Sequence, residues 1–337
     1  MMAAVIHTSA LRASGSLFGL AYGDALGKPT EFLTVAEIER RYGPTGPREL
    51  SGAPALVTDD TQMALAVGWA LHEAPSFRPE AVEPLLRRRF LAWAVSPDNN
   101  RAPGMTCLRA CAELSRGVRW QEATVVGSKG CGANMRVTPV GLLDVDLDTL
   151  AGLAQLQAGL THGHATGLAA SELTAYAVFA LRRGVPLSEL PAVLTERALG
   201  QRLVYRERWL GDLWRHAGSR SPEEFIAQGW DECLAVLRRL TNTLARPDDG
   251  GDPCQATGEG WVAEEALATA LLCAVRHADD PVAALTRGAT TAGDSDSIAA
   301  LAGAFVGAAV GMTAWPREWA DRIEYADQLA TLGAAWD

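Results

Sequence analysis

The sequence AGDSDSIAALAGAFVGAAVGMTA at residues 292–314 joins an acidic turn to an apolar segment that carries no charge. The apolar segment contains three glycines at four-residue spacing, Gly303, Gly307 and Gly311. A membrane-spanning helix usually needs about 20 apolar residues, and this segment is shorter, rich in alanine and directly preceded by aspartates. We therefore predict a buried central helix over 297–314, in which the glycines let neighbouring backbones approach closely.

Apolar residues recur at helical spacing along most of the chain, and the alternation typical of strands is almost absent. Prolines at 79, 222 and 281 occupy positions typical of helix starts. The remaining predicted helices cover residues 10–26, 61–74, 79–94, 104–115, 148–160, 166–183, 187–198, 222–244, 262–278 and 281–288. Since no linker or composition break divides the chain, we predict an all-α fold, a compact helical bundle that forms a single domain over residues 1–337.

A second ladder of glycines lies in the first predicted helix. It consists of Gly15, Gly19, Gly23 and Gly27, again at four-residue spacing. Two such ladders suit two helices in close contact, because a helix face without Cβ atoms permits short backbone distances. We predict that the helix over 10–26 packs against the glycines of the central helix.

Composition excludes some broad classes of function. The 337 residues include 48% hydrophobic and 21% charged side chains, enough apolar residues for a large core. The formal net charge of -10 argues against general nucleic-acid binding, which depends on many Lys and Arg contacts to phosphates. None of the six cysteines forms a CxxC pair, and the first residues lack a basic region followed by a long apolar run. We expect a reduced, cytoplasmic protein without a signal peptide.

Two acidic clusters precede helical segments, TDDT at 58–61 and GDSDS at 293–297. Taken singly, each is explained by helix capping, because Asp, Ser and Thr accept hydrogen bonds from the free N–H groups of a helix start. One cap needs one side chain, whereas each cluster offers two carboxylates and flanking hydroxyls. If both clusters converge with Glu31, five carboxylates share a small volume, and divalent cations would be needed to compensate them. Oxygen ligands without His or Cys favour Mg²⁺, Mn²⁺ or Ca²⁺ over Zn²⁺.

Six motifs in this order resemble the ADP-ribosylglycohydrolase family, which includes the dinitrogenase reductase-activating glycohydrolase. They are GLAYGDALGKPTEF (19–32), TDDT (58–61), SKGCGANMRVTPVGL (128–142), THGHATG (161–167), GEGWVAEEA (258–266) and AGDSDSIAALAGA (292–304). The resemblance covers about residues 10–315. It implies an orthogonal helical bundle of the ADP-ribosylglycohydrolase type, with its core in that range.

The resemblance also implies a binuclear centre of two divalent cations, Mg²⁺ or Mn²⁺. Its ligands would be Thr58, Asp59, Asp60, Asp294, Asp296 and Ser297. Glu31, Asp60 and Asp296 would be the catalytic residues, and Glu31 would act as a ligand, as a gate or as the base that activates water. Many relatives have threonine where this chain has Ser297, and serine keeps the hydroxyl oxygen while losing a methyl group. Asp24, which also resembles a family aspartate, is expected to make a structural hydrogen bond.

The remaining motifs supply the expected substrate site. By resemblance, the glycine-rich loop at 128–136 holds a pyrophosphate on its backbone N–H groups. Its expected substrate-binding residues are Ser128, Gly130, Gly132, Asn134 and Met135, and His162 joins them from the next motif. For Met135 we favour core packing over substrate contact, and Arg136 would either neutralise phosphate or brace the acidic cluster. For Trp261 we favour packing over stacking on a nucleotide.

The resemblance implies an enzyme that hydrolyses the bond between ADP-ribose and a modified target. Its substrate would be an ADP-ribosylated protein or a small ADP-ribosyl compound, and we expect a monomer without membrane association. Asp98 lies in a polar loop at 96–104, which is explained equally by turn formation and by contact with the leaving group. A carboxylate that faces a guanidinium favours an arginine-linked target. A serine-linked or other O-linked target, a catalytically silent ADP-ribose-binding protein and a two-metal phosphoesterase remain as alternatives.

Overall fold

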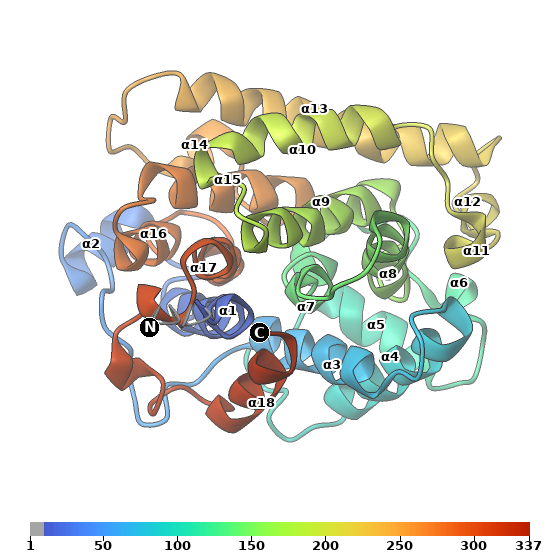
Figure 1. Cartoon of the computed structure of the whole chain (residues 1–337), viewed down its shortest axis with the longest axis horizontal. Coiled ribbons are helices and arrows are strands. Elements are labelled where there is room, and N and C mark those ends of the chain that lie inside the picture. The colour runs from blue at the N-terminus through green and yellow to red at the C-terminus, as the bar shows by residue number, and fades with distance from the viewer. Residues whose placement is uncertain (1–9) are drawn as a thin grey trace, which may run out of the picture.

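Helix α17 (Ser295–Val310) runs through the interior of the molecule beside α1 (Arg12–Gly27), as Figure 1 shows. The computed structural model describes residues 10–337. Every residue of α17 from Ser295 to Ala308 is buried, which confirms the predicted central helix. No helix of the described residues is long and apolar enough to cross a membrane.

The fold is all-α, and within residues 10–337 the only β-type pairing consists of three isolated bridges. The other helices are α2 (Val35–Tyr42), α3 (Asp59–Glu73), α4 (Pro79–Ala94), α5 (Met105–Leu114), α6 (Trp120–Ala123), α7 (Thr138–Gly141), α8 (Leu147–Gly159), α9 (Ala165–Arg182), α10 (Leu190–Gln201), α11 (Glu207–Leu210), α12 (Leu213–His216), α13 (Pro222–Leu244), α14 (Pro253–Thr257), α15 (Ala263–Arg276), α16 (Pro281–Gly288) and α18 (Ala326–Trp336). Short 3₁₀ turns lie at Cys131–Ala133, Leu187–Glu189, Met312–Ala314 and Arg317–Trp319. Figure 1 places α10 and α13 along one side of the molecule and α3, α4 and α18 along the other, with α1 and α17 between them.

Glycine ladders bring α1 and α17 into backbone contact, as predicted. A Cβ atom on Gly303 would lie 2.0 Å from the carbonyl oxygen of Gly19, and one on Gly307 would lie 2.0 Å from that of Gly15. At the other end of α1, a Cβ on Gly27 would lie 2.4 Å from the Cα of Asp296. No larger residue fits these positions without displacing a helix, so the glycines set how closely the acidic start of α17 approaches the end of α1.

Most helix bounds agree with the sequence prediction to within a few residues. The differences concern where helices end and which short helices form. The central helix stops at Val310 because Gly311 adopts a positive φ of 91°, and the predicted helix over 187–198 is divided into a 3₁₀ turn and α10. Helices α2 and α18 and the short helices α6, α7, α11, α12 and α14 were not predicted. A capping box, in which Thr34 and Glu37 exchange side-chain to backbone hydrogen bonds, begins α2 and was the signal available for it.

The proposed absence of a signal peptide concerns the N-terminal residues, and residues 1–9 lie outside the described part of the chain.

Candidate metal centre and active site

A cavity of about 340 Å³ opens where the start of α3, the start of α17 and the turn after α1 meet. Its lining combines five carboxylates with a glycine-rich loop and two aromatic side chains. The lining residues are Glu31, Phe32, Asp59, Asp60, Ala102, Pro103, Gly104, Met105, Thr106, Gly130, Cys131, Gly132, Met135, His162, Trp261, Asp294, Asp296 and Ser297. Two larger cavities, of about 440 and 750 Å³, lie elsewhere, and we place the site here because only this lining gathers the predicted carboxylates.

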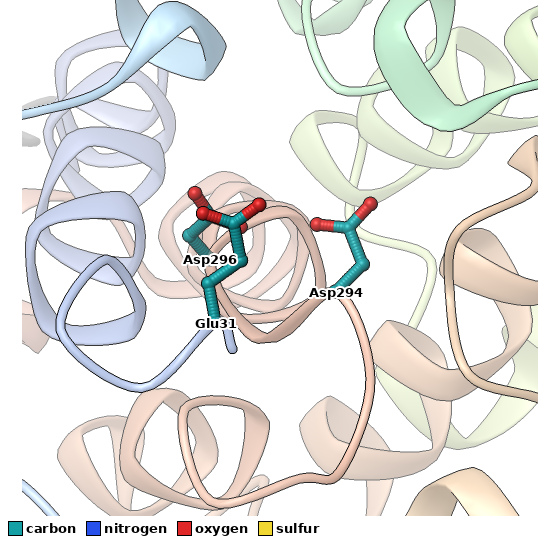
Figure 2. Close-up of side chains that lie close together, drawn as sticks. All are labelled: Glu31, Asp294 and Asp296. Atoms are coloured by element: carbon teal, nitrogen blue, oxygen red, sulfur yellow. The ribbon is translucent and has the colours of Figure 1, made fainter. Parts of the chain in front are cut away.

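Three carboxylates form the centre of the cavity. One oxygen from each of Glu31, Asp294 and Asp296 lies within 4.8 Å of the other two. Figure 2 shows the carboxylates of Glu31 and Asp296 side by side, with Asp294 reaching toward them from the turn before α17. Asp59 and Asp60, in the first turn of α3, line the same cavity. The convergence predicted from the two acidic clusters and Glu31 is therefore present.

Burial raises the pKa of every carboxyl group in this cluster, and the charge of Asp296 adds to the rise in the other four. Burial, with the charge of Asp296 next, raises the pKa of Glu31 to about 9, and burial raises that of Asp59 to about 7. The pKa values of Asp60 and Asp294 lie well above their ordinary value, first through burial and then through the charge of Asp296. Burial also raises the pKa of Asp296 itself. Without a compensating cation, the ionised forms of these groups are costly.

The donor set fits hard divalent cations. Asp60 Oδ1 is buried and has no hydrogen-bond partner among residues 10–337, although a buried carboxylate oxygen normally has one. Carboxylate and hydroxyl oxygens are the ligands that Mg²⁺, Mn²⁺ and Ca²⁺ prefer. Ser297 adds a hydroxyl at the cavity wall, and both acidic pairs lie at helix N-termini, whose dipoles favour negative charge.

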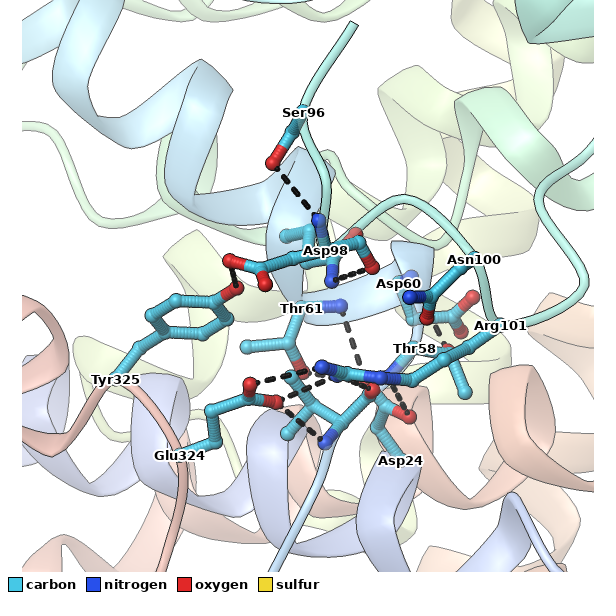
Figure 3. Close-up of polar contacts among 12 residues, drawn as sticks. Asp24, Thr58, Asp60, Thr61, Ser96, Asp98, Asn100, Arg101, Glu324 and Tyr325 are labelled. Atoms are coloured by element: carbon cyan, nitrogen blue, oxygen red, sulfur yellow. Dashed lines mark hydrogen bonds and ion pairs between the residues drawn. The ribbon is translucent and has the colours of Figure 1, made fainter. Parts of the chain in front are cut away.

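Asp24 joins the end of α1 to the start of α3. Its carboxylate accepts hydrogen bonds from Thr58 N at 2.9 Å, from Thr61 N at 3.1 Å and from Thr61 Oγ1 at 2.5 Å (Figure 3). Thr58 in turn caps α3 by accepting from Asp60 N at 3.3 Å and does not itself line the cavity. These contacts agree with the structural role expected of Asp24, which orients the helix that carries Asp59 and Asp60.

The loop at 96–104 approaches the cavity with its last residues. Gly104 N donates to Asp59 Oδ2 at 3.2 Å, which fixes the orientation of that carboxylate. Asp98 is exposed, accepts a hydrogen bond from the Tyr325 hydroxyl at 3.1 Å and does not line the cavity (Figure 3). Its expected contact with a leaving group stays a prediction.

The glycine-rich loop is only partly directed into the cavity. Gly130, Gly132 and Met135 line it, and Met135 is at the same time buried. Ser128 lies beside the lining and shares a hydrogen bond of 3.0 Å with Thr106 Oγ1. Asn134 is fully buried and donates to the carbonyl oxygen of Ala263 at 3.1 Å, so the structure places it behind the cavity wall.

The loop is held by the segment that precedes α15. Cys131 N donates to the carbonyl oxygen of Trp261, and Ala263 N donates to that of Lys129. Lys129 also forms ion pairs with Glu232 on α13 and Glu264 on α15. These contacts hold the backbone of the loop in place, as the expected pyrophosphate-binding role requires.

His162 lies at the cavity wall beneath the loop, and Arg136 lies deeper in the protein. His162 lines the cavity and is buried, and burial, with the charge of Arg136 next, lowers its pKa to about 3. Arg136 is fully buried over the ring of Phe90 and donates to Gln157 and Thr161. It forms no ion pair with a carboxylate among residues 10–337, and it does not line the cavity. Its contacts brace the scaffold below the loop, and within the described residues its side chain neither reaches the cavity nor hydrogen-bonds to the acidic cluster.

An aromatic pair at the mouth of the cavity was not predicted. Phe32 and Trp261 are stacked with their ring centroids 6.1 Å apart and their planes 16° apart. Phe32 is 70% exposed and Trp261 41% exposed, unusually high for large apolar side chains. The position of Trp261 in its motif was the one available signal, and we favoured packing there; nothing in the sequence linked Phe32 to it.

Comparisons with known proteins agree on one family. The chain matches the family model of the ADP-ribosylglycohydrolases over residues 7–336. An uncharacterized protein of Archaeoglobus fulgidus is 29% identical over 94% of this chain and 93% of its own. The ADP-ribosyl-[dinitrogen reductase] glycohydrolase of Rhodospirillum rubrum is 34% identical over 45% of this chain and 52% of its own.

Two further matches extend over nearly the whole chain. The ADP-ribosylhydrolase ARH3 of Bos taurus is 26% identical over 95% of this chain and 91% of its own. A solved structure described as an ADP-ribosylglycohydrolase-related protein complex superposes with a TM-score of 0.67 and covers 97% of both chains at 24% identity. The structural likeness supports the fold, while the sequence matches support the family.

Proposed function

Because the chain belongs to the ADP-ribosylglycohydrolase family, we propose that its acidic cavity hydrolyses the glycosidic bond between ADP-ribose and an arginine side chain, with two divalent cations bound. The observation that carries the proposal is the convergence of five carboxylates on one cavity, with Asp60 Oδ1 buried and unpaired among the described residues. We assign Asp59, Asp60, Asp294, Asp296 and Ser297 as ligands. Thr58 completes this proposed set from the cap of α3.

The cations, when bound, would polarise ribose hydroxyls and water and compensate the clustered carboxylates. Groups of the chain itself bind the pyrophosphate and transfer the proton. Gly130 and Gly132 leave the loop backbone open to the pyrophosphate, since neither carries a side chain that would cover the N–H groups. Glu31 is partly exposed at the cavity, and bound cations would lower its raised pKa, so that its carboxylate could then take a proton from the attacking water. Products are ADP-ribose and the unmodified side chain.

The mouth of the cavity supports an arginine-linked target. A guanidinium is planar and weakly hydrated, and it binds well to aromatic faces. The stacked pair of Phe32 and Trp261 offers such a face beside Glu31. The R. rubrum relative is a glycohydrolase of ADP-ribosylated dinitrogen reductase. Serine-linked ADP-ribose stays the second candidate, because the similarity to the ADP-ribosylhydrolase ARH3 over 95% of the chain fits either linkage.

The test is release of ADP-ribose from peptides modified on arginine or on serine, followed by mass spectrometry in Mg²⁺, in Mn²⁺ and in chelator. We expect metal-dependent release from the arginine-linked peptide. Release from the serine-linked peptide alone would overturn the proposed preference for arginine-linked ADP-ribose. Newly released phosphate would identify a phosphoesterase, and binding of ADP-ribose without release would identify a silent binding protein.

A further inference from the structure

The backbone around His162 is held rigidly from two sides. Val125 N donates to the carbonyl oxygen of Thr161 at 3.0 Å, and Gly163 N donates to that of Val125 at 3.1 Å. His162 N donates to the carbonyl oxygen of Ala158 at 2.8 Å. The His162 side chain is buried as well, so the ring has little freedom to turn and its two nitrogens have different and stable surroundings.

The Nδ1 side of the ring faces a short hydrogen-bond chain. Nδ1 lies 2.8 Å from Thr161 Oγ1, and that oxygen also accepts a hydrogen bond of 2.8 Å from Arg136 Nη2. An arginine stays protonated in a protein, so Arg136 is always the donor in its contact with Thr161. The direction of the remaining contact, between Thr161 and His162, then decides which nitrogen of the ring carries the proton.

The hydroxyl proton of Thr161 has two possible acceptors. One is the carbonyl oxygen of Ala158, which lies 3.5 Å from Oγ1 and already accepts from the N–H groups of Thr161 and His162. The other is His162 Nδ1, at 2.8 Å. A distance of 3.5 Å to a doubly occupied carbonyl is a poor hydrogen bond, whereas 2.8 Å is the usual length for a hydroxyl donor. The Thr161 hydroxyl therefore donates to Nδ1.

The other edge of the ring faces the cavity. A Cβ on Gly132 would lie 3.3 Å from His162 Nε2, and one on Gly130 would lie 3.5 Å from it. Within residues 10–337 the structure gives Nε2 no hydrogen-bond acceptor, and His162 is a lining residue. In a neutral imidazole one nitrogen donates when the other accepts. Nε2 is thus left with an N–H group that points to the glycine-rich loop.

We propose that Arg136 and Thr161 are positioning residues that fix His162 as the Nε2–H tautomer, so that it presents a permanent hydrogen-bond donor to an oxygen of the substrate beside Gly130 and Gly132. The inference rests on the proposed function for the identity of that oxygen, which belongs to the pyrophosphate. Its structural part does not require a ligand. Since burial lowers the pKa of His162 to about 3, the ring stays neutral and the donor does not titrate in the neutral range.

The arrangement also sets a preference between ligands. A donor fixed below the loop stabilises an acceptor oxygen and opposes a donor group at the same place, because two facing donors leave both unpaired. Arg136 adds positive charge below the same wall without reaching the cavity itself. Because a charged phosphate oxygen accepts a stronger hydrogen bond than a neutral hydroxyl, the site favours the phosphate end of a nucleotide.

The first test is the tautomer in the ligand-free protein, measured by long-range proton–nitrogen correlation on the ¹⁵N-histidine-labelled full chain. Six histidines contribute signals, and a His162→Gln spectrum assigns the one in question. We expect Nε2 to be protonated and Nδ1 to be unprotonated. A protonated Nδ1 in the wild-type protein would overturn the inference, whatever the protein binds.

The second test uses three threonine variants and binding of ADP-ribose by calorimetry. Thr161→Val removes the hydroxyl, and we expect mixed tautomers and about tenfold weaker binding, the scale of one hydrogen bond to a charged group. Thr161→Ser should restore both. Thr124→Val is the matched control. The Thr124 hydroxyl is buried beside Gly163, two residues after Thr161, and it has no hydrogen-bond partner in the described chain.

The two tests separate the possible failures. If Thr161→Val keeps a single Nε2–H tautomer and wild-type affinity, the positioning role is wrong. If Thr161→Val does not fold, the wild-type spectrum and the Thr161→Ser variant still decide the proposal. If the wild-type protein has the expected tautomer but binds no ADP-ribose, the proposed function fails while the hydrogen-bond chain stands.

Discussion

Replacing Asp59 by asparagine should stabilise the metal-free protein. Asp59 is buried, and burial together with the charges of Asp296 and Asp24 outweighs its hydrogen bond from Gly104 N. Asparagine keeps nearly the same shape and an oxygen that can accept from Gly104. It removes only the charge, which the folded state accommodates poorly without a cation.

The size and the pH dependence follow from the pKa of Asp59. A rise from 3.8 to about 7 corresponds to about 4 kcal/mol at a pH above the folded value. An acid whose pKa is raised by folding binds its proton more tightly in the folded state, so stability is lost as pH rises from about 4 to about 7. The variant lacks this loss. The two proteins should therefore be equally stable near pH 4 and differ most above pH 7.

The assay is thermal and urea unfolding of chelator-treated protein at several pH values. At pH 8 we expect Asp59→Asn to raise Tm by about 5 °C, the shift that 4 kcal/mol implies for a chain of this length. Asp279→Asn removes the same charge at an exposed position and should change Tm little. With saturating Mg²⁺ or Mn²⁺ the order should reverse, because the wild-type protein binds the cations more tightly. A metal-free variant less stable than wild type at pH 8 would refute the electrostatic account.

Three further outcomes are expected. Asp60→Asn should lower turnover at least about a hundredfold while circular dichroism stays unchanged, because it removes a proposed ligand with an unpaired buried oxygen; full activity would exclude Asp60 from the metal centre. Gly303→Ala should cost about 3 kcal/mol in urea unfolding, since its Cβ would lie 2.0 Å from Gly19 O, whereas Gly200→Ala meets nothing within 4 Å and should be neutral or mildly stabilising. Trp261→Ala should weaken the arginine-linked peptide about fivefold more than free ADP-ribose, and an equal loss for both ligands would place the aromatic pair against the nucleotide instead.

The family and the all-α fold were both predictable from the sequence, and both are confirmed. The central helix was predictable because an uncharged segment of that length with a glycine ladder is stable in a globular protein mainly as a buried helix. The second ladder on α1 made the pairing of the two helices predictable as well. Local patterns of this kind determine which faces are buried, and burial determines most of the fold.

The orientation of site side chains was less predictable, because it depends on contacts between distant segments. Asn134 belongs to a loop that faces the cavity, yet its amide binds Ala263 on α15. Asp98 binds Tyr325, more than two hundred residues further along the chain. Neither contact leaves a periodic or spacing signal in the sequence, so the motif predicted the loop but not the direction of each side chain.

The elements that the sequence did not predict also depend on contacts between distant segments. Helix α18 begins at Ala326, directly after Tyr325, which has a left-handed φ of 59° and makes no side-chain cap, so no start signal was available. The pairing of Phe32 with Trp261 joins the turn after α1 to the loop before α15. Such pairings become visible only once the bundle is assembled.

The central claim is that the acidic cavity hydrolyses an ADP-ribose linkage with divalent cations, and metal rescue of turnover tests it most directly. Chelator-treated protein is incubated with arginine-linked ADP-ribosyl peptide, Mg²⁺ or Mn²⁺ is added back, and released ADP-ribose is measured by mass, with Asp60→Asn in parallel. We predict no release before the cation is added, release after it from the wild-type protein, and little from the variant. Equal release with and without the cation, or an Asp60→Asn variant rescued as fully as wild type, would contradict the account.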